Sequence, residues 1–406
     1  MLNPLYDPYQ VLTKVYAAGA HLKLALAETP IEEAHRSRTV KVCYGVLEHD
    51  AYLAACIRSV AEKNPKQSVR ILLKIALYFL IFLEKPRYMV TDLAVELLKK
   101  MGKGGMAGFV NAALRKFDAD RVPIPEGDEG LALTTPYPLF AVKKLRAEYG
   151  ARTESIVRAK SGGVSVRFER GEEDHLTRPH TLTPFAHLFL FEHFPRDERF
   201  FAGDYTFQSV GSVAICGVVE GCARLLDACA APGGKSVLLA KKCGHVTACE
   251  LHPHRVALIE SYCARMGADN VTPVQADSSR FSPAWEGAFD GVLCDVPCSG
   301  FGTVAENPDL PLNKGEDLSA LCAVQRAILE NCARYVAAGG HLYYSTCSLF
   351  SEENDEVVSA FLSAHPEFCL CEADSPLSHV KKACGIQFLP DTAYGAGFYI
   401  AKMRRV

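Results

Sequence analysis

Apolar residues recur at two different spacings along this chain of 406 residues. Between residues 4 and 117 they lie three and four positions apart, for example in 9–16, 51–57, 69–73 and 94–98, which predicts amphipathic helices. From about Gly203 onward, short apolar runs alternate with glycine turns and longer helical stretches. We therefore expect an N-terminal helical bundle, followed in the second half by a mostly parallel sheet with helices on both faces.

Five buried strands are expected in the second half, at 224–229, 245–250, 271–275, 289–296 and 341–346. Helices are expected at 253–266 and 318–336, and the pair Gly339-Gly340 marks a break before the last strand. Prolines and glycines at 123–130 predict a linker. Residues 131–200 predict a small α+β insert with a helix at 138–149 and a strand at 163–168. The expected domains are therefore 1–122, 123–200 and 201–406.

Charge is unevenly distributed along the chain. Residues 1–121 carry 18 lysines and arginines against 12 acidic residues, although the whole chain has a net charge of −3. A basic module joined to an acidic remainder suits contact with phosphates. A solvated helical surface would show a similar excess, so the charge alone does not decide between the two.

Neither a membrane nor a metal is expected. No apolar run is long enough to span a bilayer, and the first residues lack the basic and apolar regions of a signal peptide, so we expect a cytosolic protein. Sixteen cysteines are scattered without paired CxxC spacing, which indicates reduced thiols. Cys369 and Cys371 form a lone CxC without a second ligand pair, so no zinc site is predicted.

A glycine turn joins the first expected strand of the second half to a helix. Such a turn lets a ligand approach backbone amides and the positive end of a helix. A phosphate-binding P-loop is excluded because a cysteine stands where its first glycine is required, and the dinucleotide pattern GxGxxG is absent. A nucleoside ligand remains. The residues expected to hold it are Cys229, Ala230, Ala231, Pro232, Gly233, Gly234 and Lys235.

Carboxylates end the next two strands. Glu250 lies where such folds bind ribose hydroxyls, and Asp277 follows the third strand, where it is placed to contact an adenine amino group. Each acid alone is better explained as a helix N-cap or a loop acid. The two together, at successive strand ends, favour ligand binding.

Two cysteines follow the last two expected strands. Asp295-Val296-Pro297-Cys298 ends the fourth strand, and Cys347 follows the strand at 341–346. A single cysteine is usually a small buried hydrophobic residue. Because the carboxyl ends of parallel strands meet at one edge of a sheet, we expect both thiols beside the nucleoside site. A pair in this position is hard to ascribe to packing and favours a nucleophile.

Three of these segments resemble the signature motifs of the Sun-type RNA cytosine-5 methyltransferases, which use S-adenosylmethionine. They are 227–235, 295–299 and 345–348 followed by 352–354. Residues 397–402 resemble the closing strand of that family. The helical N-terminus, with 44–47 and 108–115, resembles the NusB-type RNA-binding domain fused to the RsmB group. The resemblance implies a multidomain fold with an all-α NusB-like domain, a small α+β RNA-recognition insert and an α/β Rossmann-like class I methyltransferase domain.

The resemblance also implies a role for each thiol. Carbon 5 of cytosine is a poor nucleophile, so a thiolate must first add to carbon 6. Cys347 matches the attacking residue and Cys298 the residue that assists product release. Asp295 would stabilise the protonated ring, with its charge set by Lys235. DNA cytosine-5 methyltransferases attack from a Pro-Cys motif like 297–298, so an exchange of the two thiol roles stays open.

The expected ligands follow from the same chemistry. S-adenosylmethionine carries a positive sulfonium, and Glu250, Asp277 and Asp295 would surround it with negative charge. The target base must leave its stack, because neither thiol can reach carbon 6 inside a helix. RNA is therefore the expected partner, and we expect a monomer.

Some segments depart from the pattern of the family. The run 305–309 lacks the usual basic residues, Ser209 replaces a common aspartate after Gln208, and the usual asparagine is missing after Arg167. These segments are expected to contact RNA, so they bear on the choice of nucleotide. The leading hypothesis is methylation of small-subunit (16S) rRNA. The same reaction on tRNA or another rRNA site, and a non-catalytic RNA-binding assembly factor, are the alternatives.

Overall fold

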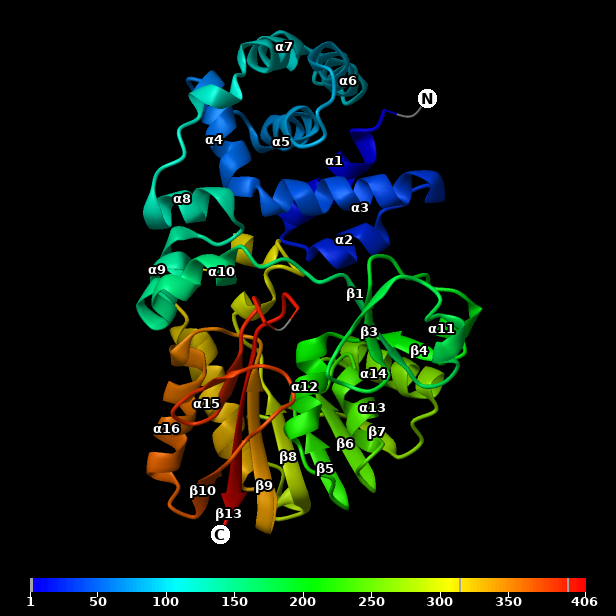
Figure 1. The fold of residues 1–406 in the computed structure, drawn as a ribbon, viewed down its shortest axis with the longest axis vertical. Coiled ribbons are helices and arrows are strands. Elements are labelled where there is room, and N and C mark those ends of the chain that lie inside the picture. Colours follow the sequence, from blue (N-terminus) through cyan, green and yellow to red (C-terminus); the bar gives the residue numbers. More distant parts are fainter. Residues whose placement is uncertain (1–2, 314, 393) are drawn as a thin grey trace. The chain divides into compact units, whose positions relative to one another are not determined.

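The computed structural model describes residues 3–313, 315–392 and 394–406, and the chain divides into two compact units. The first comprises Met1–Val157 and Asn307–Gly315, and the second comprises Arg158–Glu306 and Glu316–Val406. The first unit is helical, and both sheets belong to the second (Figure 1). Among the described residues, no helix is both long and apolar enough to cross a membrane.

The helical unit is built around one buried helix, α5 (Gln67–Ile81). Its sequence is apolar nearly all round, which suits an interior position. The surrounding helices are α1 (Tyr6–Ala18), α2 (Leu22–Glu28), α3 (Glu33–Glu48), α4 (Asp50–Val60), α6 (Arg87–Lys100) and α7 (Ala107–Lys116). All of them except α2 pack directly against α5 over several residues. The helical bundle predicted over residues 4–117 is confirmed.

Residues 123–157, which the sequence places in the linker and insert, pack with the helical unit. They form α8 (Gly127–Thr134), α9 (Leu139–Tyr149) and α10 (Thr153–Val157). α8 contacts α4 and α9. The helix expected at 138–149 is therefore present as α9.

A short excursion of the chain, Asn307–Gly315, also belongs to the helical unit. Its buried Asp309 accepts a hydrogen bond from the backbone N–H of Leu22 at 3.2 Å and lies 3.3 Å from Nδ1 of His21. A carboxylate at the first turn of α2 satisfies an N–H that has no partner within the helix. The non-basic run at 305–309 thus supplies a helix cap.

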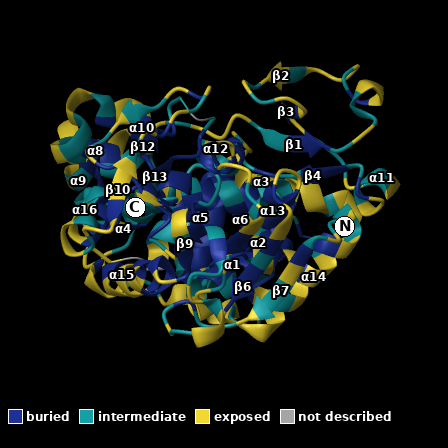
Figure 2. Cartoon of the chain, turned by 90° about the horizontal axis from the view of Figure 1, so that it is seen from below, coloured by how far each residue is buried: buried dark blue, intermediate teal, exposed yellow. Residues whose placement is uncertain are grey.

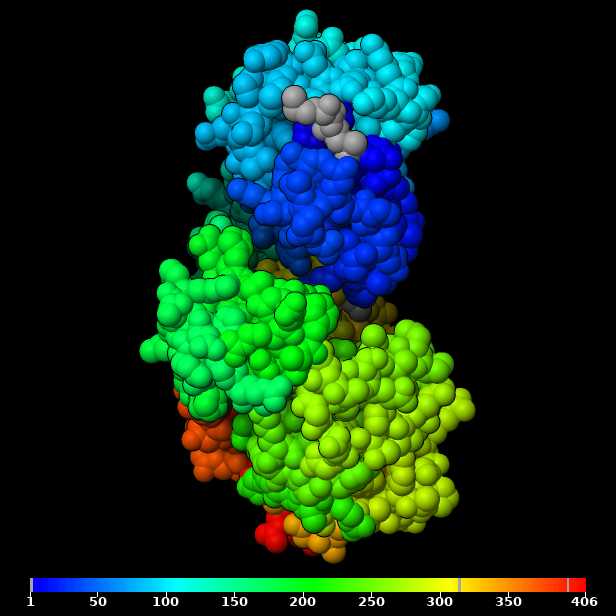
Figure 3. Space-filling model, turned by 90° about the vertical axis from the view of Figure 1, so that its right-hand side faces the viewer, coloured from blue at the N-terminus to red at the C-terminus, as the bar shows by residue number. Residues whose placement is uncertain are grey.

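The insert is a four-stranded antiparallel sheet in the order β2-β3-β1-β4. Its elements are β1 (Val164–Phe168), β2 (His180–Leu182), β3 (Leu188–Phe191), α11 (Glu198–Phe201) and β4 (Tyr205–Phe207). Phe168 lies at the centre of an aromatic core, with ring centroids 5.5 to 5.7 Å from those of His175, Phe194 and Tyr205. In the space-filling view the insert forms one continuous body, coloured green (Figure 3).

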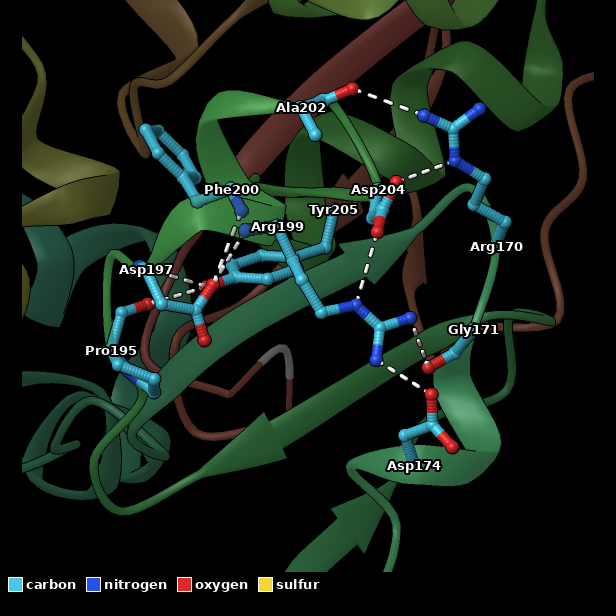
Figure 4. Close-up of polar contacts among 10 residues, drawn as sticks. All are labelled: Arg170, Gly171, Asp174, Pro195, Asp197, Arg199, Phe200, Ala202, Asp204 and Tyr205. Carbon is cyan, nitrogen blue, oxygen red and sulfur yellow. Dashed lines mark hydrogen bonds and ion pairs between the residues drawn. The ribbon is translucent and has the colours of Figure 1, made fainter.

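Polar contacts fix the loops of the insert (Figure 4). Arg199 donates to Asp204 at 3.0 Å and to Asp174 at 2.7 Å, so it joins two loops that are distant in sequence. The hydroxyl of Tyr205 donates to Asp197 at 2.8 Å, and Asp197 also caps the first turn of α11. These contacts fix the loops that surround the aromatic core.

Among the described residues the larger sheet has nine strands, of which five form the parallel arrangement that the sequence predicts. Their order is β9-β8-β5-β6-β7, with β5 (Arg224–Asp227), β6 (His245–Glu250), β7 (Val271–Gln275), β8 (Phe289–Asp295) and β9 (Val336–Thr346). Next to β9 the sheet becomes antiparallel through β13 (Phe398–Arg405), β12 (Ile386–Phe388) and β11 (Val380–Lys381). β10 (Phe368–Cys371) also pairs with β13 in the antiparallel sense. The sheet is therefore mixed rather than mostly parallel.

Successive residues of the central strands face opposite sides of this sheet. Leu225 and Tyr343 pack with α12 (Val210–Val218), α13 (Gly234–Ala240) and α14 (Pro253–Met266). Leu226 and Leu342 pack with α15 (Ser319–Ala333) and α16 (Asp355–Ala364) on the other face (Figure 1). Exposed residues concentrate on the outer faces of α14 and α15 (Figure 2). Both faces are thus covered, which explains why the strands are continuously apolar.

Two expected boundaries were wrong. β9 begins at Val336 and runs through Gly339 and Gly340, with an irregular register opposite β8 between residues 289 and 291. Gly339 adopts a φ of 74°, which lets the strand bulge without ending. The helix expected at 318–336 ends at Ala333, because the following residues enter this strand.

Candidate active site

The glycine turn connects β5 to α13 and lies against the end of β6. The N–H of Ala230 donates to the carbonyl of Cys249 at 2.9 Å, and the N–H of Gly233 donates to the carbonyl of Ala230 at 2.7 Å. Gly233 has a φ of 104°, and a Cβ there would lie 3.3 Å from Ile259. A glycine is therefore required for α13 to begin at this point.

A residue that the sequence did not single out, Asp227, lies at the base of this turn. It is 1% exposed and accepts a hydrogen bond from the hydroxyl of Ser236 at 2.7 Å. Its Oδ1 atom is buried and has no partner among the described residues. Burial raises the pKa of Asp227 to about 6. Oδ1 of Asp227 is therefore a buried hydrogen-bond acceptor beside the turn that a ligand could use.

The two acids predicted to contact the cofactor make different contacts. Glu250 is buried at the end of β6, accepts from the N–H of His252 at 3.0 Å and pairs with Arg255 at 3.2 Å. Asp277 is half-buried and accepts from the N–H of Ser279 at 3.0 Å. The hydroxyl of Ser279 lowers the pKa of Asp277, which keeps this carboxylate charged. Both acids lie after adjacent strands, as predicted.

Asp295 and Lys235 form an ion pair across the ends of β8 and α13. Oδ2 of Asp295 lies 2.7 Å from Nζ of Lys235, and its Oδ1 accepts from the hydroxyl of Ser345 at 2.7 Å. Burial opposes the charge of Lys235, but the carboxylate of Asp295 outweighs it, so the pKa of Lys235 lies above its ordinary value. Both oxygens of Asp295 are therefore fixed by donors from neighbouring elements.

The two thiols lie side by side. Sγ of Cys298 is 3.2 Å from Sγ of Cys347, and it accepts a hydrogen bond from the N–H of Cys347 at 3.3 Å. The adjacent parallel strands β8 and β9 bring these residues together, 49 positions apart in the chain. The adjacent thiol of Cys347 and burial both raise the pKa of Cys298, although the backbone N–H of Cys347 opposes them. Cys298 is thus a thiol that keeps its proton.

A buried carboxylate, Glu353, ties together the loops that carry the two thiols. It accepts from the N–H of Ser299 at 2.8 Å and from Gln325 at 2.9 Å, and it receives the hydroxyls of Ser299 and Ser348. Ser299 follows Cys298, and Ser348 follows the other thiol. Sequence reasoning noted Glu353 within a motif but gave it no role, because nothing in the chain order shows that these two loops meet.

Two further residues support the site: Asn354 holds the thiol loop, and Gln208 holds the glycine turn. Asn354 is buried, accepts from the hydroxyl of Thr346 at 2.6 Å and donates to Gln387 at 3.0 Å. Gln208 accepts from buried Arg167 at 2.7 Å and donates to the carbonyl of Gly234 at 3.1 Å. Ser209, which replaces the aspartate common in the family, still caps α12 by accepting from Ser212.

Comparison with known proteins identifies the family. Residues 219–404 match the family model described as 16S rRNA methyltransferase RsmB/F, and residues 9–119 match the NusB family. The chain is 30% identical over 421 residues to the probable ribosomal RNA small subunit methyltransferase B of Bacillus subtilis, covering 95% of this chain and 94% of that protein. The chain belongs to the RsmB/F family. It is also 30% identical to ribosomal RNA small subunit methyltransferase B of Xylella fastidiosa, covering 97% and 98% of the two chains.

The fold agrees with this RsmB/F membership. A solved structure described as "Crystal Structure of PH0851" superposes with a TM-score of 0.84 and covers 99% of this chain and 98% of that one. At 22% identity, this likeness concerns the fold. The resemblance drawn from the sequence motifs, the NusB-like helical domain and the methyltransferase fold are thereby confirmed.

As a member of the RsmB/F family, the protein is an rRNA methyltransferase that uses S-adenosylmethionine. The residues present fit this cofactor. The glycine turn leaves room above Gly234, since a Cβ added to this residue would lie no closer than 3.7 Å to any side-chain atom. The buried Oδ1 of Asp227 offers an unused acceptor beside it. Glu250 and Asp277 add carboxylates at the next two strand ends.

Proposed function

We propose that this protein methylates carbon 5 of a cytosine in 16S rRNA through a covalent adduct between the base and Cys347. The observation that carries the proposal is the pair of thiols, 3.2 Å apart, at the ends of two adjacent parallel strands. The Asp295–Lys235 ion pair lies at the end of the same strand as Cys298. Methyl transfer to a nitrogen or a hydroxyl needs no such pair of thiols.

Cys347 acts as the nucleophile in this proposal. Its thiolate adds to carbon 6, and the electron pair of the 5,6 double bond makes carbon 5 reactive. The bound cofactor supplies an electrophilic methyl group. A solvent water then takes the proton from carbon 5, and the electron pair of that C–H bond restores the 5,6 double bond. The bond between carbon 6 and sulfur breaks, and its electrons leave on Cys347 as a thiolate. Cys298 retains its proton next to this sulfur, so it is placed to assist the departure of Cys347.

The ion pair orients the ring. With Lys235 on one oxygen and Ser345 on the other, the carboxylate of Asp295 has a fixed direction. A fixed carboxylate accepts hydrogen bonds from the amino group of cytosine and from N3 once solvent has protonated it. This proton offsets the negative charge that the thiolate brings to the ring on addition. This polar edge distinguishes cytosine from uracil, since uracil presents a carbonyl there.

The proposed substrate is small-subunit rRNA, because the relatives in Bacillus and Xylella are named for it. The target base must be unstacked before either thiol can reach carbon 6. Glu353 then keeps the two thiol loops in register while the base is bound, since it receives donors from both.

The test is to incubate the protein with tritiated S-adenosylmethionine and 16S rRNA from a strain that lacks the enzyme, and to identify the labelled nucleoside. We expect 5-methylcytidine from the wild type and none from Cys347→Ala. A labelled nucleoside other than 5-methylcytidine, or equal labelling by Cys347→Ala, would refute the proposal. Labelling of tRNA in preference to rRNA would show that tRNA is the substrate, and the proposed reaction at carbon 5 would stand.

A further inference from the structure

The helical unit contains a cavity of about 560 Å³ that no part of the methyl-transfer chemistry uses. It is lined by residues of α1, α4 and α5, by the loop between α4 and α5, and by Leu312 of the excursion Asn307–Gly315. Ligand-binding pockets commonly have volumes of roughly 300–1,000 Å³. The cavity is therefore large enough for a nucleotide.

The floor of the cavity is an internal charge pair. Asp50 accepts hydrogen bonds from the ammonium of Lys74 and from the hydroxyl of Tyr16. The ammonium also lies 4.7 Å from the centroid of the Tyr16 ring, and only 7% of the Lys74 side chain is exposed. Both donors reach the same oxygen, Oδ1, and the charges of Asp50 and Lys74 balance each other.

The walls carry more positive charge than the floor can balance. Arg58, Lys63 and Arg70 line the cavity, and among its described lining residues the one acid besides Asp50 is Glu62, which is exposed. Within the part of the chain that the structure describes, Arg58 and Lys63 form no ion pair, and Arg70 donates to the neutral side chain of Asn64. The cavity is therefore an anion site by charge.

The pKa of Lys74 reflects this excess of positive charge. Its pKa is lowered, first by burial and further by the nearby charges of Arg70 and Arg58, although Asp50 opposes both effects. Like charges held together in this way repel one another. A bound phosphate would relieve the repulsion.

Apolar side chains also line the cavity, among them Ile57, Pro65 and Leu312. A nucleotide has a flat apolar base at one end and a phosphate at the other, so it matches both the apolar and the basic parts of the lining. An inorganic anion would leave the apolar residues uncovered, and an acidic peptide offers no comparable flat ring.

We propose that this cavity binds one unstacked nucleotide of the substrate RNA, with its phosphate against Arg58, Lys63 and Arg70 and its base against Pro65 and Leu312. The proposal rests on the conclusion that the substrate is RNA. It does not depend on which base is methylated. The helical unit would then hold the RNA at a point separate from the thiols.

The test measures RNA binding by the full-length protein with a fluorescein-labelled single-stranded RNA of 15 nucleotides across a series of salt concentrations. The double variant Arg58→Gln/Lys63→Gln is compared with Arg36→Gln/Arg38→Gln, which removes two exposed charges from α3 outside the cavity. We expect about a tenfold loss of affinity for the cavity variant and less than a twofold loss for the control. The slope of log K against log salt should fall by about 1.4, since each neutralised phosphate contributes about 0.7 for single strands. Thermal midpoints confirm that both variants are folded.

Two further arms identify the ligand. RNA containing 4-thiouridine should cross-link to peptides within residues 50–74, and this cross-link should be lost in the cavity variant. Adenosine monophosphate should compete only at much higher concentration than the RNA, because it lacks the rest of the chain. Equal losses in both double variants, or stronger competition by poly-glutamate than by RNA, would overturn the proposal. If the wild type binds RNA through the cavity but forms no 5-methylcytidine, the proposed function fails and this inference stands.

Discussion

Two buried lysine–aspartate pairs, one in each unit, differ in their charge balance. The side chains of Lys235 and Asp295 are 17% and 20% exposed, and those of Lys74 and Asp50 are 7% and 22% exposed. Burial opposes the charge of both lysines. Nevertheless the pKa of Lys235 lies above its ordinary value, whereas that of Lys74 lies below.

The neighbours of each pair explain the difference. A second carboxylate, Asp227, helps to raise the pKa of Lys235, whereas Arg70 and Arg58 help to lower that of Lys74. The active site is thus balanced by acids of the chain itself. The cavity holds positive charge that a phosphate would balance. Similar pairs therefore serve different purposes, one to orient a base and the other to attract an anion.

Breaking the active-site pair should have the largest effect. Lys235→Met removes one of the two donors that fix Asp295, and we expect the rate of methyl transfer to fall about 10²- to 10³-fold, as for other oriented electrostatic groups. The measurement is single-turnover labelling of rRNA. Lys241→Met, which removes a lysine that pairs with Glu169 at the end of the same helix, is the control. Similar losses in both variants would contradict the role given to Lys235.

Glu353 differs from both aspartates of these pairs, because it is a buried acid whose hydrogen bonds come from neutral donors and not from a lysine. Glu353→Gln places a donor among four donors, so we expect a loss of about 2 kcal/mol in the free energy of unfolding. Urea titration measures this loss. The exposed variant Glu356→Gln, three positions further along the chain, should lose less than about 0.5 kcal/mol, as surface substitutions usually do. A result in which both variants unfold alike would mean that Glu353 does not join the thiol loops.

Breaking the pair in the cavity should affect stability less. Lys74→Met leaves Asp50 with the hydroxyl of Tyr16 and partial exposure, so we expect a loss of about 1–2 kcal/mol, below the 3–5 kcal/mol typical of fully buried pairs. The same urea titration applies. Arg58→Gln should instead stabilise the free protein slightly, because it removes a charge that repels Lys74. Destabilisation by Arg58→Gln would argue against an excess of positive charge.

The smallest effect concerns Asp227 and depends on pH. Its pKa of about 6 lies above the value of about 4 expected in the unfolded chain, so the charged form destabilises the fold. This penalty is absent below about pH 4 and complete above about pH 6. Relative to the wild type, Asp227→Asn should therefore gain about 1 kcal/mol of stability between pH 5.5 and pH 7.5. The altered hydrogen bond to Ser236 costs the same at both pH values and cancels from this difference. Equal differences at the two pH values would contradict the raised pKa.

Local patterns predicted the elements that depend on short stretches of chain. The strands at 245–250 and 271–275 and the helix at 253–266 are present with the expected bounds. The proximity of Cys298 and Cys347 followed from the rule that parallel strand ends share one edge of the sheet. The bounds of these elements and the proximity of the two thiols could be predicted from local patterns and from the order of elements along the chain.

Features that depend on packing between distant segments escaped prediction. The antiparallel half of the sheet, the extension of β9 through Gly339 and the contacts of Glu353 each require knowledge of which segments meet. The cavity of the helical unit is assembled from several helices and from Leu312, more than 200 positions beyond the others. No periodicity in the sequence indicates such a meeting.

The most direct test of the account is the fate of the covalent adduct in the two thiol variants. Each protein is incubated with S-adenosylmethionine and labelled rRNA, denatured and separated by gel electrophoresis. Because Cys347 forms the bond and Cys298 assists its release, we predict a stable protein–RNA band with Cys298→Ala and none with Cys347→Ala. An adduct that accumulates with Cys347→Ala and is absent from Cys298→Ala would show that the two thiols exchange these roles, and would contradict the account.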